Sequence, residues 1–99
     1  MTAPRDASYQ SYLVESLKDP AEAAAFIDAA MELEDPAALL AALRHVAKAH
    51  GMAEVARRAE LGDKTLFKAL GEQGNPTLET VTKVLHAVGL RLSVAPVHA

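Results

Sequence analysis

The segment Met52–Leu70 constrains the fold of this chain more than any other part of it. Apolar residues recur at the spacing of one helix face over residues 52–59 and again over residues 66–70. A short break that contains Gly62 separates the two runs, and the small side chain of Ala56 allows two helices to cross closely. Two short helices joined by a tight turn form a helix-turn-helix, whose second helix can enter the major groove of DNA.

Length and composition leave room for one domain. The chain has 99 residues, of which 51% are apolar, and this share excludes general disorder. Because the chain contains no Cys, disulfides, thiolate metal sites and thiol nucleophiles are excluded. The N-terminus lacks a basic region followed by an apolar run, and no apolar stretch approaches the length of a membrane span. We therefore expect a cytoplasmic protein that does not enter a membrane.

The charges are distributed unevenly around a net charge of −3. Residues 1–35 contain two cations and eight anions, a net charge of −6, whereas residues 36–99 contain eight cations and five anions, a net charge of +3. Solvated helix faces alone would produce such an asymmetry. It also places the helix-turn-helix pattern in the basic part of the chain, which agrees with binding to nucleic acid.

Further helices are indicated on both sides of this segment. Asp-Pro steps at residues 19–20 and 35–36 have the pattern of an N-cap followed by a first helical residue, and Thr77 is a third N-cap candidate. Gly51 is a suitable helix stop, and a short first helix is expected over residues 9–17. The apolar faces predicted for these helices consist of Tyr9, Leu13 and Leu17; of Ala23, Phe26, Ile27, Ala30 and Met31; of Leu39, Leu40, Leu43, Val46 and Ala47; and of Leu78, Val81, Leu85 and Val88.

The C-terminal tail has a different period. Leu90, Leu92 and Val94 alternate with Arg91 and Ser93, which predicts a short β-strand. No second strand is evident elsewhere in the sequence, and a lone strand leaves backbone groups unpaired. We therefore expect the same strand of a second copy to pair with it, so that Leu90, Leu92 and Val94 form part of a dimer interface.

A series of short strings covers most of the chain and supports a family resemblance. They are Tyr12-Leu13, Ser16-Leu17-Lys18-Asp19-Pro20, Ala23-Ala24-Ala25-Phe26, Ala29-Ala30, the run Leu39–Gly51, Met52, Ala56-Arg57, Leu66-Phe67-Lys68-Ala69-Leu70, Gly74-Asn75-Pro76-Thr77-Leu78 and Gly89-Leu90-Arg91-Leu92. The Asn75–Leu78 string and the Gly-Leu-Arg-Leu ending are the most specific in combination. In these strings the chain resembles addiction-module antidote proteins, which are small bacterial antitoxins of the HigA-like kind.

The resemblance implies an all-α fold of the lambda-repressor type with a helix-turn-helix. Residues 1–35 are expected to form an acidic N-terminal helical extension, and residues 36–99 a DNA-binding domain that ends in the short strand. The implied function is that of an antitoxin in a type II toxin-antitoxin module. Such a protein represses its own operon by binding double-stranded operator DNA, and it neutralises a RelE/HigB-like ribonuclease toxin.

The turn of the helix-turn-helix departs from the family pattern. Relatives carry Gly at the first turn position, where this chain has Glu60. A left-handed backbone is strained for a residue with a Cβ atom. We therefore expect the turn to shift toward Gly62, which changes the register of the recognition helix by about one residue.

The recognition helix carries the candidate base contacts Asp63, Lys64, Thr65 and Lys68. Lys can donate to guanine O6 and N7, Thr can contact either base edge or the thymine methyl, and Asp can accept from cytosine N4. An alternative role for Asp63 is capping of the helix, and solvation is the alternative for the two lysines. Phe67 has two possible places, the core or a DNA-facing contact, and we expect it in the core.

Three further residues are candidates for phosphate contacts. Arg57 lies on the outer side of the preceding helix and ranks above Arg58, because it follows Ala56 as in the relatives. The amides near Asn75, together with Thr77, could hold a phosphate at the next helix N-terminus, where simple capping is an equal possibility.

No enzyme, metal or cofactor is expected. His45 and His50 are five residues apart and point to different faces of a helix, whereas metal pairs on a helix need a spacing of three or four. The acidic residues Glu15, Glu22, Asp28 and Glu32 have two interpretations, a solvated face or a docking surface for a basic toxin.

Two alternatives to the antitoxin function remain open. One is a prophage-type repressor without a toxin partner, which has the same DNA chemistry. The other is a protein-interaction module whose helix-turn-helix has lost DNA affinity, which the net acidity and Glu60 favour.

Overall fold

The computed structural model describes residues 3–97, and side chains from Tyr9 onward. This part of the chain contains six α-helices and no β-strand. The helices are α1 (Ala3–Leu17), α2 (Pro20–Glu32), α3 (Pro36–His50), α4 (Met52–Ala59), α5 (Asp63–Leu70) and α6 (Leu78–Ala87). The predicted all-α class is therefore confirmed.

Three helices begin where the sequence predicts an N-cap. The Asp19 and Asp35 carboxylates accept hydrogen bonds from the backbone N–H groups of Ala21 and Ala37 at 3.2 and 3.0 Å. The hydroxyl oxygen of Thr77 accepts from the N–H of Thr80 at 3.1 Å. Each bond satisfies an N–H group that the first helical turn leaves without a partner.

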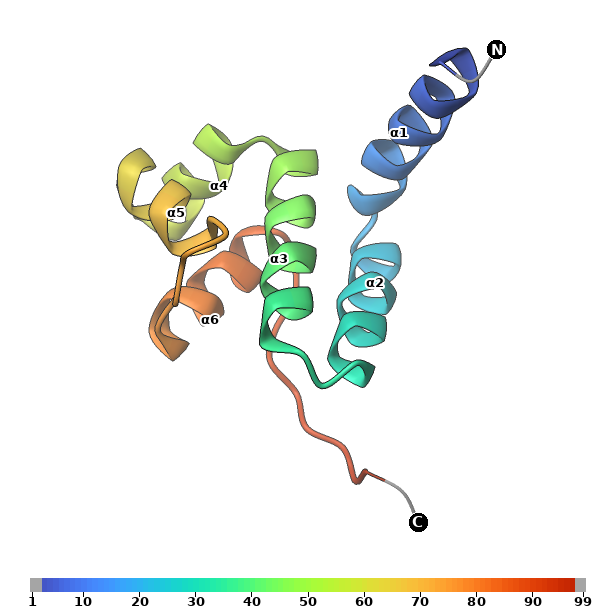
Figure 1. Ribbon diagram of the computed structural model, residues 1–99. Helices are drawn as coiled ribbons and strands as arrows, with labels where there is room; N and C mark the ends of the chain where they lie inside the picture. The colour runs from blue at the N-terminus through green and yellow to red at the C-terminus, as the bar shows by residue number, and fades with distance from the viewer. Residues whose placement is uncertain (1–2, 98–99) are drawn as a thin grey trace.

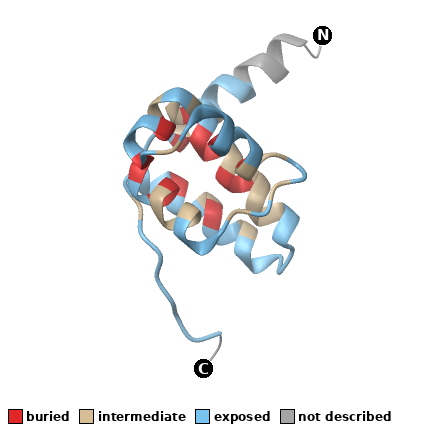
Figure 2. Cartoon of the chain, turned by 90° about the vertical axis from the view of Figure 1, so that its left-hand side faces the viewer, coloured by how far each residue is buried: buried red, intermediate tan, exposed pale blue. Residues whose placement is uncertain are grey.

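Helix α3 occupies the centre of the molecule (Figure 1). Helices α1 and α2 pack on one side of it, and α4 and α5 contact it on the other, with α6 packed against α4. Figure 2 marks the buried residues, which are distributed over the packed helices. Among the described residues, the core consists of Leu17, Ala23, Ile27, Ala42, Leu43, Val46, Ala47, Ala49, Val55, Ala56, Ala59, Leu66, Leu70, Val84, Leu85, Ala87 and Val88.

The predicted C-terminal strand is not present within residues 3–97. The tail leaves α6 through a hydrogen bond from Leu90 N–H to the Leu85 carbonyl at 2.8 Å, and then runs away from the body of the protein (Figure 1). Leu92 is 44% exposed and Val94 is 99% exposed. The prediction was wrong for this chain by itself, because a strand requires a hydrogen-bonded neighbour and none of the described segments offers one.

Three further predictions of burial were wrong. Tyr9 on α1 is 63% exposed. Leu78 is 72% exposed because it is the first residue of α6 and extends beyond the packed layers. Met31 is 52% exposed near the end of α2, where no other helix covers it. Val84, which the predicted α6 face omitted, is buried.

Gly74 fixes the path of the loop between α5 and α6. A Cβ atom at this position would lie 2.1 Å from the main-chain carbonyl oxygen of Ala69. No side chain can be accommodated at that distance, so glycine allows the loop to pass directly over the end of α5. This close approach sets where α6 begins relative to α5.

Candidate nucleic-acid interface

The turn between α4 and α5 has its left-handed residue at Glu60, with φ 58° and ψ 44°. Gly62 is extended, with φ −69° and ψ 151°, and is the N-cap of α5. The expected shift of the turn toward Gly62 was therefore wrong. Hydrogen bonds from Glu60 N–H to the Arg57 carbonyl and from Leu61 N–H to the Ala56 carbonyl close the end of α4, and they hold Glu60 in the left-handed region despite its Cβ atom.

Helix α5 has one buried face and one exposed face. Leu66 and Leu70 are completely buried, and their spacing of four residues places both on the inner side. Lys64 and Lys68 have the same spacing and lie on the opposite side of the helix, where both are exposed. Thr65 is also exposed. The buried pair thus fixes which side chains of α5 face outward.

Phe67 is 57% exposed, so its predicted place in the core was wrong. The helical spacing puts it beside Lys64 and Lys68 rather than in line with Leu66 and Leu70. The outer face of α5 therefore combines two cations, a hydroxyl and an aromatic ring.

Asp63 is the first residue of α5 and is exposed. Because Gly62 is the N-cap and makes no side-chain cap bond, Asp63 lies inside the first turn instead of at the N-cap position. A carboxylate there interacts favourably with the positive end of the helix. Its side chain is also at the end of α5 that carries Lys64 and Thr65.

The lysines of α5 differ from other cations of this region in their surroundings. Lys83 on α6 forms an ion pair with Glu79 at 3.3 Å. Within the described part of the chain, no acidic group lies within salt-bridge distance of Lys64 or Lys68. Their charge is therefore available to an anionic partner.

The two arginines of α4 share one acidic partner. Arg57 Nε donates to Glu54 Oε1 at 3.1 Å, and a second contact joins Arg57 Nη2 to Glu54 Oε2. Arg58 Nε donates to Glu54 Oε2 at 2.8 Å, and Arg58 Nη1 donates to the main-chain carbonyl of Ala87 at 3.3 Å. Arg57 remains 70% exposed, whereas Arg58 links α4 to the end of α6.

This ion-pair cluster perturbs two ionisation equilibria. The hydrogen bond from Arg57 lowers the pKa of Glu54, with a smaller contribution from Arg58 and partial opposition from burial. The same hydrogen bond raises the pKa of Arg57. Glu54 therefore neutralises part of the positive charge of Arg57 near neutral pH, which the sequence-based assignment of Arg57 to phosphate did not anticipate.

Arg44 is a contributor to this region that sequence reasoning missed. Its Nη1 donates to the main-chain carbonyl of Leu70, the last residue of α5, at 2.8 Å. The available signal was an arginine that directly follows Leu43 of the predicted apolar face of α3. Arg44 does not form part of the outer face of α5, but it ties the end of that helix to α3.

Asn75 and Thr77 lie in the exposed segment before α6. The hydroxyl of Thr77 donates to the hydroxyl of Thr80 at 3.1 Å and also caps the helix. The capping role is thus present. In Figure 1 the start of α6 lies with α4 and α5 on the side of the molecule away from α1 and α2.

The described residues also bear on metal sites and membrane spans. No group of three or more His, Cys, Asp or Glu side chains has an arrangement that could hold a metal ion. None of the described helices combines the length and the apolar composition that crossing a membrane requires.

Comparisons with known proteins assign the chain to a family. A family model described as "Probable addiction module antidote protein" matches residues 9–96. An uncharacterized protein of Haemophilus influenzae is 33% identical over 82 residues, which cover 83% of this chain and 84% of that protein. No solved structure gives a significant match. The chain therefore belongs to the family of probable addiction module antidote proteins.

Proposed function

We propose that this protein is the antidote of a type II toxin-antitoxin module and binds operator DNA as a homodimeric repressor of its own operon. Family membership supports the antidote role. The observation that carries DNA binding is the outer face of α5, where Lys64, Thr65 and Lys68 are exposed and the lysines have no ion-pair partner among the described residues. The protein acts by binding, without catalysis, in the cytoplasm.

In this proposal α4 and α5 are the two helices of a helix-turn-helix. The N-terminal part of α5 enters the major groove, where Lys64 and Lys68 donate to guanine and Thr65 contacts a base edge or a thymine methyl. Asp63 accepts from a cytosine amino group. Rigid placement of α5 supports this role, since its buried leucines and the Arg44 hydrogen bond fix both its rotation and its end.

Phosphate contacts are assigned to residues that flank α5. Arg57 is exposed on α4, and Asn75 and Thr77 are exposed at the start of α6. Contacts of this kind set the position of the protein on the duplex but do not read its sequence. Arg57 exchanges part of its interaction with Glu54 for a phosphate when DNA binds.

Mobility shifts on the promoter region of the protein's own operon test this proposal. Lys68→Gln should weaken the complex by about tenfold, since a good base contact contributes roughly 1–3 kcal/mol. Lys83→Gln removes the same charge from an ion-paired lysine outside the interface and should have little effect. Half-sites should lie about 10 base pairs apart. The absence of any complex at low salt would refute DNA binding.

The proposed protein partner is a cationic ribonuclease of the RelE/HigB-like type. Support comes from the net charge of −6 in residues 1–35 and from exposed acidic groups on α2, including Glu22 and Glu32. Opposite charges accelerate encounter and select the partner. Antidote proteins act on a toxin, which is the general expectation that the family carries.

Co-expression with the product of the adjacent gene tests the toxin partner. The wild-type chain should restore growth of cells that express the toxin, and Glu22→Lys with Glu32→Lys should weaken this rescue while DNA binding is retained. Lys48→Glu, which adds negative charge on α3, is a matched control and should retain rescue. Full rescue by the double variant would remove these acidic groups from the mechanism.

Two other functions predict different results in the same experiments. A repressor without a toxin partner would bind its promoter, yet neither rescue growth nor co-purify with the neighbouring product. A protein-interaction module would bind a protein partner and give no mobility shift. The lysines of α5 are exposed and have no ion-pair partner among the described residues, which favours the DNA-binding proposal over the interaction module.

A further inference from the structure

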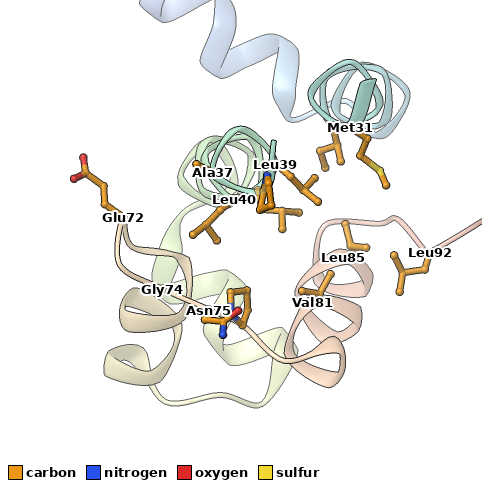
Figure 3. Close-up of a pocket in the computed structure, with 14 residues that line it drawn as sticks. Met31, Ala37, Leu39, Leu40, Glu72, Gly74, Asn75, Val81, Leu85 and Leu92 are labelled. Carbon is orange, nitrogen blue, oxygen red and sulfur yellow. The ribbon is translucent and has the colours of Figure 1, made fainter. Parts of the chain in front are cut away.

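An apolar groove lies between α2, α3 and α6. Its main cavity has a volume of about 410 Å³, is open to solvent on one side, and is lined by residues of α2, α3, the loop before α6, α6 itself and the start of the tail. Figure 3 shows Met31, Leu39 and Leu40 on one side of this space and Val81, Leu85 and Leu92 on the other. A second cavity of about 230 Å³ adjoins it and shares Ile27, Met31, Leu85 and Leu92.

The groove explains why several predicted core residues are only partly buried. Leu39, Leu40 and Val81 belong to the apolar faces of their helices, but the groove leaves one side of each without a neighbour. Unfilled space of this kind loses the dispersion contacts that close packing provides. Insertion of an apolar side chain from another segment into the groove would therefore be favourable.

The C-terminal tail borders the groove and has unpaired groups of its own. After Leu90, no main-chain group up to residue 97 takes part in a hydrogen bond with another described residue. Val94 and Val97 are 99% and 86% exposed, whereas Leu92 lines both cavities. The tail thus contacts its own groove at Leu92. Figure 2 shows that the exposed end of the chain runs away from the helices.

The charges at the groove complement those of the tail. Asp28 on α2 and Arg91 on the tail both line the second cavity, and both are exposed. Within the described residues neither is part of an ion pair. One copy therefore offers an apolar groove with an acidic group and also an apolar tail with a basic group. The groove of one copy is complementary to the tail of another, as a twofold interface requires.

We propose that the groove is the docking site for the C-terminal tail of a second copy of this chain. In the twofold dimer, Val94 and Val97 of each copy enter the groove of the other, and Arg91 of each copy pairs with Asp28 of the other. The five residues Ser93–Val97 are joined by four residue steps, which span about 13 Å in extended form, and this is the length of tail that can reach toward the second copy. The inference rests on the proposed homodimer and identifies its interface.

Sedimentation of the full chain without DNA gives the first test. Val94→Asp should raise the dissociation constant of the dimer by at least about tenfold, because burial of a valine side chain lowers that constant by about tenfold or more. Leu78→Asp is the control, because Leu78 is an exposed apolar residue that does not line the groove. A monomeric wild type, or a dimer that withstands Val94→Asp, would overturn the proposal.

Charge reversal distinguishes an ion pair between two copies from an ion pair within one chain. Asp28→Arg and Arg91→Asp should each form weak homodimers. In each variant, residues 28 and 91 carry the same charge, and the twofold dimer brings them together at two places. A mixture of the two variants should form heterodimers in preference, since every facing pair is again of opposite charge. If the two groups pair within one chain, mixing will have no effect, and the proposed exchange of tails is wrong.

The lack of cysteine in the chain permits a covalent test. Val94→Cys in one tagged preparation and Met31→Cys in another should give a mixed disulfide after oxidation, and Leu78→Cys should not react with Val94→Cys. In a chain with both Val94→Cys and Met31→Cys, rapid closure within the monomer would show that the tail folds back on its own groove, which would contradict the proposal. Mobility shifts on the same variants separate this outcome from failure of DNA binding.

Discussion

Arg44 Nη1 donates a 2.8 Å hydrogen bond to the main-chain carbonyl oxygen of Leu70, 26 residues further along the chain. Leu70 is the last residue of α5, where helix carbonyls lack partners within the helix. The bond therefore serves the end of α5 and fastens it to α3. Because Leu66 and Leu70 also anchor the inner face, the direction in which Lys64 and Lys68 project depends on contacts made on the opposite side of the helix.

Arg44→Met should destabilise the protein by about 1–3 kcal/mol, as measured by urea denaturation. The change leaves the Leu70 carbonyl without its donor in a partly buried position, and hydrogen bonds from charged groups are stronger than neutral ones. DNA affinity should also fall, because the end of α5 loses its attachment. Lys48→Met removes an exposed cation from the same helix and is the matched control. Equal stability of the two variants would show that the bond contributes nothing.

Glu60→Gly should stabilise the protein by about 1 kcal/mol, which raises the melting temperature by roughly 4–8 °C for a domain of this size. Glu60 has a φ of 58°, a conformation that costs a residue with a Cβ atom free energy and costs glycine little. Glu60→Ala retains the Cβ atom and should give no such gain. Thermal unfolding of the wild type, Glu60→Gly and Glu60→Ala gives the melting temperatures to compare. A lower melting temperature for Glu60→Gly would mean that the Glu60 side chain contributes more stability than its backbone strain costs.

The sequence predicts the starts of α2, α3 and α6 well because each of these three starts has a local chemical cause. Asp19, Asp35 and Thr77 cap helices with their own side chains, and Gly51 ends one at a φ of 96°. Such contacts involve residues two or three positions apart, so they can be deduced without knowledge of the tertiary structure. The exposed lysines of α5 follow for the same reason, since helical spacing alone sets them opposite Leu66 and Leu70.

Features that depend on distant parts of the chain could not be deduced in this way. Phe67 and Leu78 are apolar and have helical spacing, yet no other element covers them. The acceptor for Arg44 lies 26 residues away, and the partner that ties Arg58 to α6 lies 29 residues away. The tail has the alternation of a strand, but strand formation needs a neighbour that a single chain does not supply.

Gly74→Ala should destabilise the protein by about 3 kcal/mol, because its Cβ atom would lie 2.1 Å from the Ala69 carbonyl oxygen and the main chain must move. Gly62→Ala is the control. Its φ is −69°, and the nearest atom to an added Cβ, the Thr65 hydroxyl oxygen, is 3.7 Å away. Gly62→Ala should change stability by less than about 1 kcal/mol. Chemical denaturation should separate the two variants clearly; similar values would contradict the close approach at Gly74.

The stability difference between the wild type and Glu54→Gln should depend on pH. The pKa of Glu54 lies below its ordinary value of 4.5, because Arg57 and Arg58 favour the ionised carboxylate. A group with a lowered pKa in the folded state contributes stability above the ordinary pKa and loses it as the pH falls through the folded value. Denaturation at pH 7 should therefore favour the wild type slightly, and the difference in stability between the two proteins should be smaller at pH 3. A constant difference at both pH values would contradict the ion-pair origin.

Glu54→Gln should tighten DNA binding, although it removes an ion pair from the protein. Glu54 holds the side chain of Arg57 through two contacts and offsets its charge on the proposed phosphate-binding face. Without that carboxylate, Arg57 meets a phosphate without exchanging partners, so affinity should rise at low salt and the salt dependence should steepen by at most about one counterion. Glu79→Gln frees Lys83 on α6 in the same manner and should leave affinity nearly unchanged. Titrations at several salt concentrations measure both quantities. Weaker binding by Glu54→Gln would show that the Glu54 contacts orient Arg57 for phosphate instead of competing with it.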